Sequence, residues 1–504
     1  MQEIVIGEGS LALEDIRRVA REGHPVRLSE AALERMRAGR EVVETFERED
    51  RPSYGITRGL GKRVVNRIAD EDRASFSRRM LRARAGGAGE PLAEEVVRAA
   101  MLARISSMSW GGSGARPLVA ETLAAMLNAG VTPVVPSIGS FGAADLLLMA
   151  NVGLTVVGEG EAFYRGKRVP GDEALAAAGI TPIDPQSKEG LALCSANSIS
   201  AGMGGLALGD LAAAERSLMT AGALSFEAFR GNPSPYDARV AHARPAPGQA
   251  EAAEAFRALL AGGKLFDEGA PRRVQDPISL RCISQVHGAL YAAMEFARPA
   301  VQVELDGAGD NPLVLSDDFE ILSNGNFHTP ALALAFDTLS LAVVSCAQMS
   351  QRRIAKLMSE ELSDLPAGLN DNPSSTAGTG ILGAVAELLV KEMRVMAAPA
   401  TLHTDATYDV EDHAPMTLIA VRKLRDLLPL LHHVTACELM AGAQAFELRG
   451  EPKAGPSVET AYHAVREEIP FLYEDRSTRT ELARLAALVG EGRFAELPAR
   501  NTAV

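Results

Sequence analysis

Several polar side chains in this sequence of 504 residues could remove a proton from carbon and hold a carboxylate. Tyr54 lies in a glycine-rich stretch, where a loop could bring its hydroxyl close to a substrate, and a phenolate is a strong base. Arg58, four residues further on, could favour the phenolate through its opposite charge. Arg281 offers the planar guanidinium that grips a carboxylate with two hydrogen bonds, and Asn311 could add another. Taken singly, each residue fits a packing role as well as a catalytic one.

Two charged residues stand in otherwise apolar, helix-forming sequence. Lys391 lies within LLVKEMRVM, and Glu411 lies within YDVEDHAPM. Charged residues in such places are usually paired inside the protein, and a smaller share of them take part in catalysis. We therefore keep both as candidates for contact with the polar part of a substrate.

Long helices must position these residues. Aromatic residues make up only 5% of the chain, and apolar residues recur at three- and four-residue spacing. The stretch from Leu341 to Leu357 fits one long helix, and residues 414–448 fit another, with a bend at Pro429. The pattern predicts a mainly α fold in which long helices pack on one another and on other subunits. Most polar candidates lie in glycine- and proline-rich loops between the helices.

The chain is expected to form two domains. Loop-rich sequence gives way to long helices near residues 200–220. Residues 1–210 are expected to form an N-terminal, loop-rich helical domain that carries the Tyr54 loop. Residues 211–504 are expected to form a central bundle of long helices with the C-terminal helices.

Composition excludes several classes of protein. The net charge of −14 argues against nucleic acid or an anionic membrane as a partner. The four cysteines are far apart and match no metal-site spacing, so we expect reduced core thiols and no bound metal. The N-terminus lacks the features of a secretory signal, and no run of ~18 uninterrupted apolar residues predicts a membrane span. A cytoplasmic protein is expected.

Short motifs spread along nearly the whole chain resemble those of the histidine and phenylalanine ammonia-lyase family. In chain order they are SYGITRGLG, GAGEPL, GGSGARPLVAETLAAMLNAGVTPVVPSIGS, GEGEAF, KEGLAL, VQDPISLRC, QVHGAL, DNPLV, GNFH, SQRRIAKLM and EDHAPM. The resemblance implies the long-helix bundle of the ammonia-lyase (fumarase/aspartase-like) superfamily. It also implies a homotetramer in which loops of three subunits assemble each active site.

The resemblance assigns roles to the candidate residues. Tyr54 matches the base that removes a proton from the substrate β-carbon. Arg281 and Asn311 match the residues that bind the substrate carboxylate. Glu411 matches the acidic residue near the substrate side chain, and His413 in the same motif is expected to be structural.

The sequence departs from the family at the site of the electrophile. Members that carry the methylidene-imidazolone group build it from Ala-Ser-Gly, whereas Ala143, Ala144 and Asp145 occupy this place, in a loop one residue shorter. Without the serine and the glycine the triplet cannot cyclise, and no cofactor is expected. Five other residues differ from those of the family and are expected to line the substrate pocket: Arg58, Arg84, Ser195, Asn197 and Ile278.

Loss of the electrophile, with the base and the carboxylate clamp kept, predicts a substrate that needs no electrophile. A trimethylammonium group has no lone pair with which to attack one, and it leaves as neutral trimethylamine. A thioimidazole can accept the negative charge that develops at the β-carbon, with Lys391 and Glu411 as candidates to stabilise it. The chain therefore resembles a cofactor-free branch of the family that converts ergothioneine to thiourocanate and trimethylamine.

Other functions stay open. The chain could be an electrophile-free lyase or isomerase for another histidine-like or aromatic amino acid derivative. It could also be a catalytically inactive homologue that binds a ligand or partner subunits, or an ordinary ammonia-lyase. The fumarase and aspartase branch is set aside because its Gly-Ser-Ser-x-Met-Pro loop is absent. No histidine pair or glycine-rich loop has the spacing of a metal or phosphate site.

Overall fold

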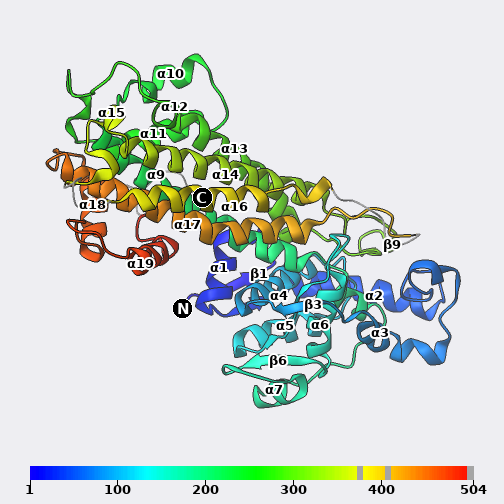
Figure 1. Cartoon of the computed structure of the whole chain (residues 1–504). Coiled ribbons are helices and arrows are strands. Elements are labelled where there is room, and N and C mark those ends of the chain that lie inside the picture. The colour runs from blue at the N-terminus through cyan, green and yellow to red at the C-terminus, as the bar shows by residue number, and fades with distance from the viewer. Residues whose placement is uncertain (372–377, 403–409, 496–504) are drawn as a thin grey trace. The chain divides into compact units, whose positions relative to one another are not determined.

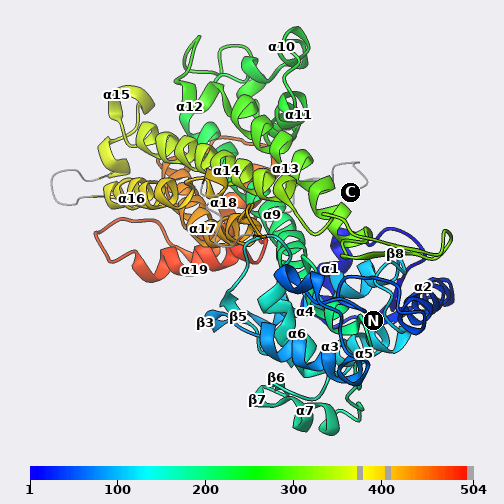
Figure 2. The same cartoon turned by 90° about the vertical axis from the view of Figure 1, so that its right-hand side faces the viewer.

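The computed structural model describes residues 1–371, 378–402 and 410–495. This part of the chain consists mainly of helices, with a few short strands (Figures 1 and 2). The mainly α class expected from the sequence is therefore confirmed.

The chain folds into two compact units, and each is built from three stretches. Unit 1 comprises Met1–Gly209, Arg298–Ala335 and Pro399–Arg422, and unit 2 comprises Asp210–Ala297, Phe336–Ala398 and Lys423–Val504. The first break lies beside the expected boundary at residue 210. Later stretches return to unit 1, so a single cut in the sequence does not describe the units.

Unit 1 combines short helices with all nine strands of the described residues. Its helices are α1 (Leu13–Glu22), α2 (Glu30–Arg48), α3 (Asp70–Arg84), α4 (Glu94–Met108), α5 (Pro117–Ala129), α6 (Leu146–Val156), α7 (Gly171–Ala177) and α8 (Glu189–Cys194), with the 3₁₀ helices η1 (Gly61–Val65) and η5 (Ala400–Leu402). Its strands are β1 (Ile4–Ile6), β2 (Val26–Leu28), β3 (Ala88–Pro91), β4 (Thr132–Pro133), β5 (Pro136–Ile138), β6 (Glu161–Tyr164), β7 (Lys167–Pro170), β8 (Leu313–Leu315) and β9 (Glu320–Leu322).

The strands form four small sheets. In the pair β1–β2 the strands are parallel, and Ile4 lies opposite Val26. The other sheets, β3–β5, β4–β6–β7 and β8–β9, are antiparallel. In the β8–β9 hairpin, Leu313 lies opposite Leu322.

Unit 2 contains helices and loops but no strand among its described residues. Its own helices are α10 (Ala238–Ala243), α11 (Gln249–Leu260), α12 (Ile278–Arg281), α15 (Glu360–Ser363), α16 (Gly380–Met396), α18 (Pro456–Glu468) and α19 (Arg479–Gly490), with η2 (Ser234–Tyr236), η3 (Lys264–Phe266) and η4 (Ala367–Leu369). The unit boundaries fall inside four long helices: α9 (Ser198–Phe229), α13 (Ile283–Asp306), α14 (Pro330–Leu357) and α17 (Thr417–Leu448).

The two long helices expected from the sequence are confirmed as α14 and α17. Pro429 lies inside α17.

Local sequence also explains where helices begin and end. The hydroxyl of Ser29 accepts a hydrogen bond from the N–H of Ala32 at the start of α2, and Gly130 ends α5 in the left-handed conformation.

Aromatic side chains fill part of the core of unit 2. Phe226 and Phe229 of α9, Phe256 of α11 and Phe446 of α17 are all buried. The rings of Phe226 and Phe256 meet edge to face, with centroids 5.3 Å apart. None of the four cysteines forms a disulfide in the structure, and all except the partly exposed Cys282 are buried.

Two helices in the described residues are long and apolar enough to cross a membrane by length and composition. They are the stretch Glu189–Phe229, which comprises α8 and α9, and α14. The apolar window of the first lies entirely inside the protein, and 61% of the second is buried. Core helices of globular proteins meet the same criteria.

Candidate active site

Tyr54 is partly buried in a loop that packs on α8. Its hydroxyl oxygen accepts a hydrogen bond from the N–H of Gly61 at 3.0 Å, and the N–H of Gly55 donates to the carbonyl of Arg58 at 2.9 Å. Gly55 has φ of 67°, and a Cβ there would lie 2.2 Å from Cδ1 of Leu191. Glycine thus lets the loop close onto α8 and hold the Tyr54 hydroxyl in a defined place.

A buried ion pair links α8 to the loop of Asn311. Nε of Arg104 donates to the carbonyl of Ala192 at 2.6 Å, and Nη2 of Arg104 lies 2.7 Å from Oδ1 of Asp310. The next residue, Asn311, accepts a hydrogen bond from the N–H of Asn324 at 3.1 Å. The Arg104–Asp310 pair therefore helps to hold the start of the β8–β9 hairpin, and Asn311 with it, next to α8.

Two more titratable groups lie at the ends of α8. Nζ of Lys188 is buried and has no hydrogen-bond partner among the described residues. Burial lowers the pKa of Lys188 to about 8, against the opposing effect of Asp310. Burial raises the pKa of the Cys194 thiol to about 11, against the charges of Arg84 and Arg104. Arg84 is the last residue of α3, and α3 packs on α8.

Backbone hydrogen bonds to Phe327 and Ala196 hold the shortened loop of Ala143, Ala144 and Asp145 in place. The N–H of Ala144 donates to the carbonyl of Phe327 at 3.0 Å, and the N–H of Asp145 donates to the carbonyl of Ala196 at 2.9 Å. Ala144 has φ of 64°. The electrophile expected for this family needs a serine hydroxyl and a glycine nitrogen, whereas Ala143, Ala144 and Asp145 offer neither. These residues do not fit that group.

The side chain of Asp145 closes the loop onto the start of α9. It accepts hydrogen bonds from the hydroxyl of Ser140 at 2.6 Å, the N–H of Ser200 at 2.7 Å and the hydroxyl of Ser200 at 2.9 Å. Complete burial raises the pKa of Asp145, and these hydrogen bonds oppose that effect. The carboxyl group therefore has a structural task in the loop.

Asn197 connects the shortened loop to a buried carboxyl group. Its Nδ2 donates to Oε2 of Glu304 at 3.1 Å and to the carbonyl of Phe327 at 3.0 Å. Burial raises the pKa of Glu304 to about 7; the hydrogen bond from Asn197 opposes this and the charge of Asp145 adds to it. Glu304 can therefore exchange a proton near neutral pH. Ser195 is also buried, and its N–H donates to Leu191 at 2.7 Å.

Two histidines lie close to the loop of Ala143 to Asp145. Nε2 of His328 lies 2.8 Å from Nδ1 of His413, and the backbone of His328 pairs with that of Ala143. Burial, with a smaller effect of His413, lowers the pKa of His328. His413 thus contacts a residue that borders the shortened loop.

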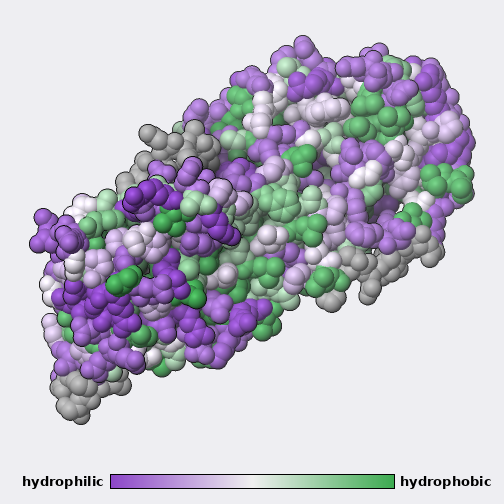
Figure 3. All heavy atoms as spheres, turned by 90° about the horizontal axis from the view of Figure 1, so that it is seen from above, coloured by the Kyte–Doolittle hydropathy of each residue, from purple (hydrophilic) through white to green (hydrophobic). Residues whose placement is uncertain are grey.

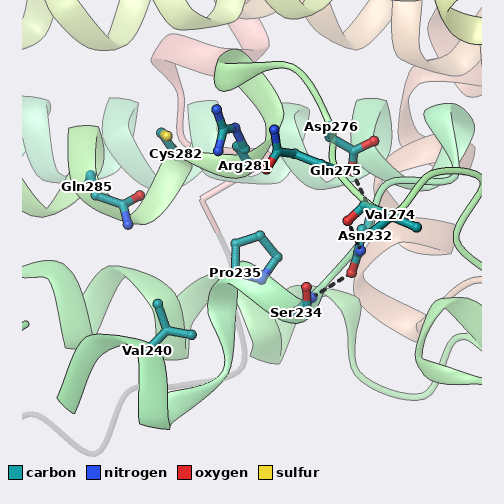
Figure 4. Close-up of a pocket in the computed structure, with 10 residues that line it drawn as sticks. All are labelled: Asn232, Ser234, Pro235, Val240, Val274, Gln275, Asp276, Arg281, Cys282 and Gln285. Carbon is teal, nitrogen blue, oxygen red and sulfur yellow. Dashed lines mark hydrogen bonds between the residues drawn. The ribbon is translucent and has the colours of Figure 1, made fainter. Parts of the chain in front are cut away.

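Arg281 lines a cavity of about 260 Å³ in unit 2 (Figure 4). Figure 4 shows Arg281 and Cys282 on one side of the cavity, with Pro235 and Val240 across from them. Nε of Arg281 is buried and has no hydrogen-bond partner in the described part of the chain. A cationic side chain that lines a cavity favours an anionic ligand there, and a carboxylate matches the geometry of a guanidinium.

The remaining candidate residues lie in more open places. Ile278 begins α12 and is exposed, and Glu411 lies on an exposed segment that precedes α17. The guanidinium of Arg58 donates to the carbonyl of the preceding residue at 3.1 Å.

Lys391 does not have the apolar surroundings that its sequence suggests. Nζ of Lys391 lies 2.8 Å from Glu387, and both side chains are more than half exposed. The apolar neighbours Val390 and Met393 instead belong to the buried face of α16. This is a correction to the sequence interpretation, because the helix turns Lys391 away from that face.

Unit 1 thus gathers most of the candidate residues around α8, and unit 2 holds Arg281, Ile278 and Lys391. Sequence reasoning did not single out Lys188 or Asp310, although the quoted motifs KEGLAL and DNPLV contain them. Arg104 and Glu304 lie in ordinary helical sequence, with no local signal of their burial. In the described ranges no group of three histidine, cysteine or acidic residues could hold a metal ion.

Comparisons with known proteins give similarity over almost the whole chain. Residues 11–467 match the sequence profile described as aromatic amino acid lyase. Histidine ammonia-lyase of Caldanaerobacter subterraneus subsp. tengcongensis is 39% identical over 502 residues, which cover 99% of this chain and 98% of that protein.

Solved structures are similar over the same extent. The ergothioneine-degrading enzyme ergothionase of Treponema denticola, in complex with desmethyl-ergothioneine sulfonic acid, has a TM-score of 0.94 and 27% identity, and the match covers 98% of this chain and 100% of that one. Tyrosine aminomutase of Streptomyces globisporus has a TM-score of 0.92 and 31% identity, and the match covers 100% of this chain and 99% of that one.

Proposed function

The chain belongs to the aromatic amino acid lyase family, whose members are carbon–nitrogen lyases, and we propose that it eliminates an amine without an electrophile. The proposed reaction converts ergothioneine to thiourocanate and trimethylamine. One observation carries the proposal: Ala143, Ala144 and Asp145 cannot form the electrophile, whereas Tyr54 and Arg281, which we propose as base and carboxylate ligand, are present.

The leaving group explains how the reaction can do without an electrophile. The trimethylammonium nitrogen has no lone pair, so it cannot bond to an electrophilic carbon, and it already leaves as a neutral amine. What the reaction still requires is removal of the β-proton and stabilisation of the charge that develops on the heterocycle. Both tasks can be performed by amino acid side chains.

Each step is assigned to residues of this chain. Arg281 and Asn311 hold the carboxylate, and Tyr54 removes the β-proton. The two electrons of the broken C–H bond form the new double bond, and the C–N bond breaks to release trimethylamine. Lys391 and Glu411 bind the thioimidazole during this step. The unpaired buried Nε of Arg281 supports the first assignment, and the similarity to ergothionase supports the substrate.

We propose a homotetramer with shared active sites, and α16 supports this. Ile381, Leu388 and Val395 are 59%, 61% and 76% exposed, and their seven-residue spacing puts them on one face of the helix. Lys391 lies three residues after Leu388 and four before Val395, beside this face. A subunit that covers the stripe would also cover Lys391 and Glu387. Figure 3 shows apolar residues (green) exposed among hydrophilic ones (purple) on one face of the molecule.

Charge substitution tests the assembly. Leu388→Asp should reduce the molar mass measured by light scattering, because it places a charge in the proposed subunit contact. Glu361→Ala, an exposed residue of the short helix α15, is the control. An unchanged mass for Leu388→Asp would exclude this face from the contact.

The free state of all four cysteines agrees with our further proposal that the enzyme works in the cytoplasm.

The function is tested by incubating the purified protein with ergothioneine, hercynine or histidine and measuring trimethylamine and ammonia by mass spectrometry. Trimethylamine from ergothioneine is the expected result, and Tyr54→Phe should abolish it without changing the molar mass. Trimethylamine from hercynine alone would assign a sulfur-free substrate. An isomer of histidine, with no free amine, would point to the isomerase function that the aminomutase similarity keeps open. No product from any of the three would contradict the proposal.

A further inference from the structure

The helix that carries Arg281 is too short to supply hydrogen-bond donors for the carbonyl groups at its C-terminal end. α12 consists of only four residues, and the N–H groups of Leu280, Arg281 and Cys282 bond back to Pro277 and Ile278. The carbonyls at the end of a helix have no partners within it. Those of Ser279 and Leu280, directly before Arg281, therefore need donors from elsewhere.

Tyr236 supplies one donor at this point. Its hydroxyl donates to the carbonyl of Leu280. This hydrogen bond holds the backbone directly before Arg281. The Tyr236 side chain is fully buried, and its ring packs on Phe256 with centroids 4.6 Å apart.

A buried ion pair supplies the second donor. Nη1 of Arg353 donates to the carbonyl of Ser279 at 3.4 Å. Its other nitrogens, Nε and Nη2, bind the two carboxylate oxygens of Glu438 at 2.6 and 2.8 Å. Both side chains are fully buried. Glu438 thus fixes the plane of the guanidinium and the direction of its remaining donor.

We infer that Tyr236, supported by the Arg353–Glu438 pair, is a positioning residue that sets the direction of Arg281 into its cavity. A bidentate guanidinium–carboxylate contact tolerates little rotation, so freedom in the backbone around Arg281 would weaken it. This inference rests on the proposed function, in which Arg281 binds the substrate carboxylate. It adds the residues of unit 2 that keep Arg281 in position.

The test compares Tyr236→Phe with Tyr462→Phe in the full-length protein. Tyr462 is a matched control, since it is also buried in unit 2 and bonds through its hydroxyl to Glu447 and Glu451 rather than to α12. Hydrogen exchange read by mass spectrometry should be faster in Tyr236→Phe for peptides that cover residues 280–284, and unchanged there in Tyr462→Phe. This measurement requires no substrate. Unchanged exchange in Tyr236→Phe would overturn the inference.

Kinetics with ergothioneine provide the second readout. Tyr236→Phe should raise KM by about tenfold with kcat changed less than about twofold, because the loss falls on carboxylate binding. Arg353→Lys, which keeps the positive charge but lacks the planar guanidinium with its several donors, should raise KM in the same way. If the wild-type protein does not use ergothioneine but Tyr236→Phe still exchanges faster at residues 280–284, the result would support the role of Tyr236 in holding the Arg281 backbone and contradict the proposed substrate. A wild type that turns over ergothioneine, with equal KM in both tyrosine variants, would contradict the positioning role alone.

Discussion

Removing Asp310 should destabilise unit 1 more than removing its partner Arg104. Both side chains are only 1% exposed, and the pair is 2.7 Å apart. Leaving one partner of a buried pair without the other costs about 3–5 kcal/mol. Lys188 determines which substitution is more destabilising, because its buried Nζ interacts electrostatically with both residues. In Asp310→Leu two buried cations remain without an anion, whereas in Arg104→Met the carboxylate of Asp310 keeps Lys188 as a counter-ion.

We therefore expect a loss of about 3 kcal/mol for Arg104→Met and about 5 kcal/mol for Asp310→Leu, the two ends of that range. Urea unfolding can be followed by the fluorescence of Trp110, the only tryptophan in the chain, which lies just after α4 in unit 1. Arg17→Met, which removes an exposed pair with Glu14, is the control and should cost under about 1 kcal/mol. Equal losses for the two buried variants, or the reverse order, would refute the role given to Lys188.

Four further outcomes are expected. The pKa of Lys188 falls from 10.5 to about 8 on folding, so the unfolded chain binds more protons between these values and stability should rise with pH there; Lys188→Met should lose this rise in urea midpoints measured from pH 8 to 10.5. The pKa of Glu304 rises from 4.5 to about 7, so the folded state binds more protons in that window and stability should fall with rising pH; a slope kept in Glu304→Gln would contradict this. Ala144→Gly should raise the melting temperature, because relief of about 1–2 kcal/mol from the left-handed conformation exceeds the roughly 0.4–1 kcal/mol gained by the unfolded chain, and Ala143→Gly is the control. Intact-protein mass should equal that of the unmodified sequence, and a mass reduced by lost water would show that the loop cyclises after all.

Much of the fold was readable from local patterns. The helical periodicity around Leu341–Leu357 became α14, and the long apolar stretch with Pro429 became α17. Such patterns are reliable because a long helix must place its apolar residues on one face wherever it packs. The two units were harder to foresee, since four helices contain unit boundaries and the chain returns to unit 1 twice after residue 210.

In the candidate site, too, some features could be predicted from the sequence and others could not. The types of side chain at Tyr54, Arg281 and the Ala143–Asp145 loop could be read directly, because the chemistry of a base, a guanidinium or a missing serine belongs to the residue itself. The surroundings of Lys391 were misjudged, because neighbours in sequence on a helix point in different directions.

The sequence by itself determined the family, the helical class and the absence of the triplet that the electrophile needs. Only the tertiary structure showed that the Tyr236 hydroxyl bonds to the carbonyl directly before Arg281, that Arg104 and Asp310 form a buried pair near Lys188, and that Glu304 is buried beside Asn197. The physical reason is that burial and hydrogen bonding depend on residues far apart in the chain, such as Arg104 and Asp310. The energy of a charge or a polar group depends on those neighbours more than on its own identity.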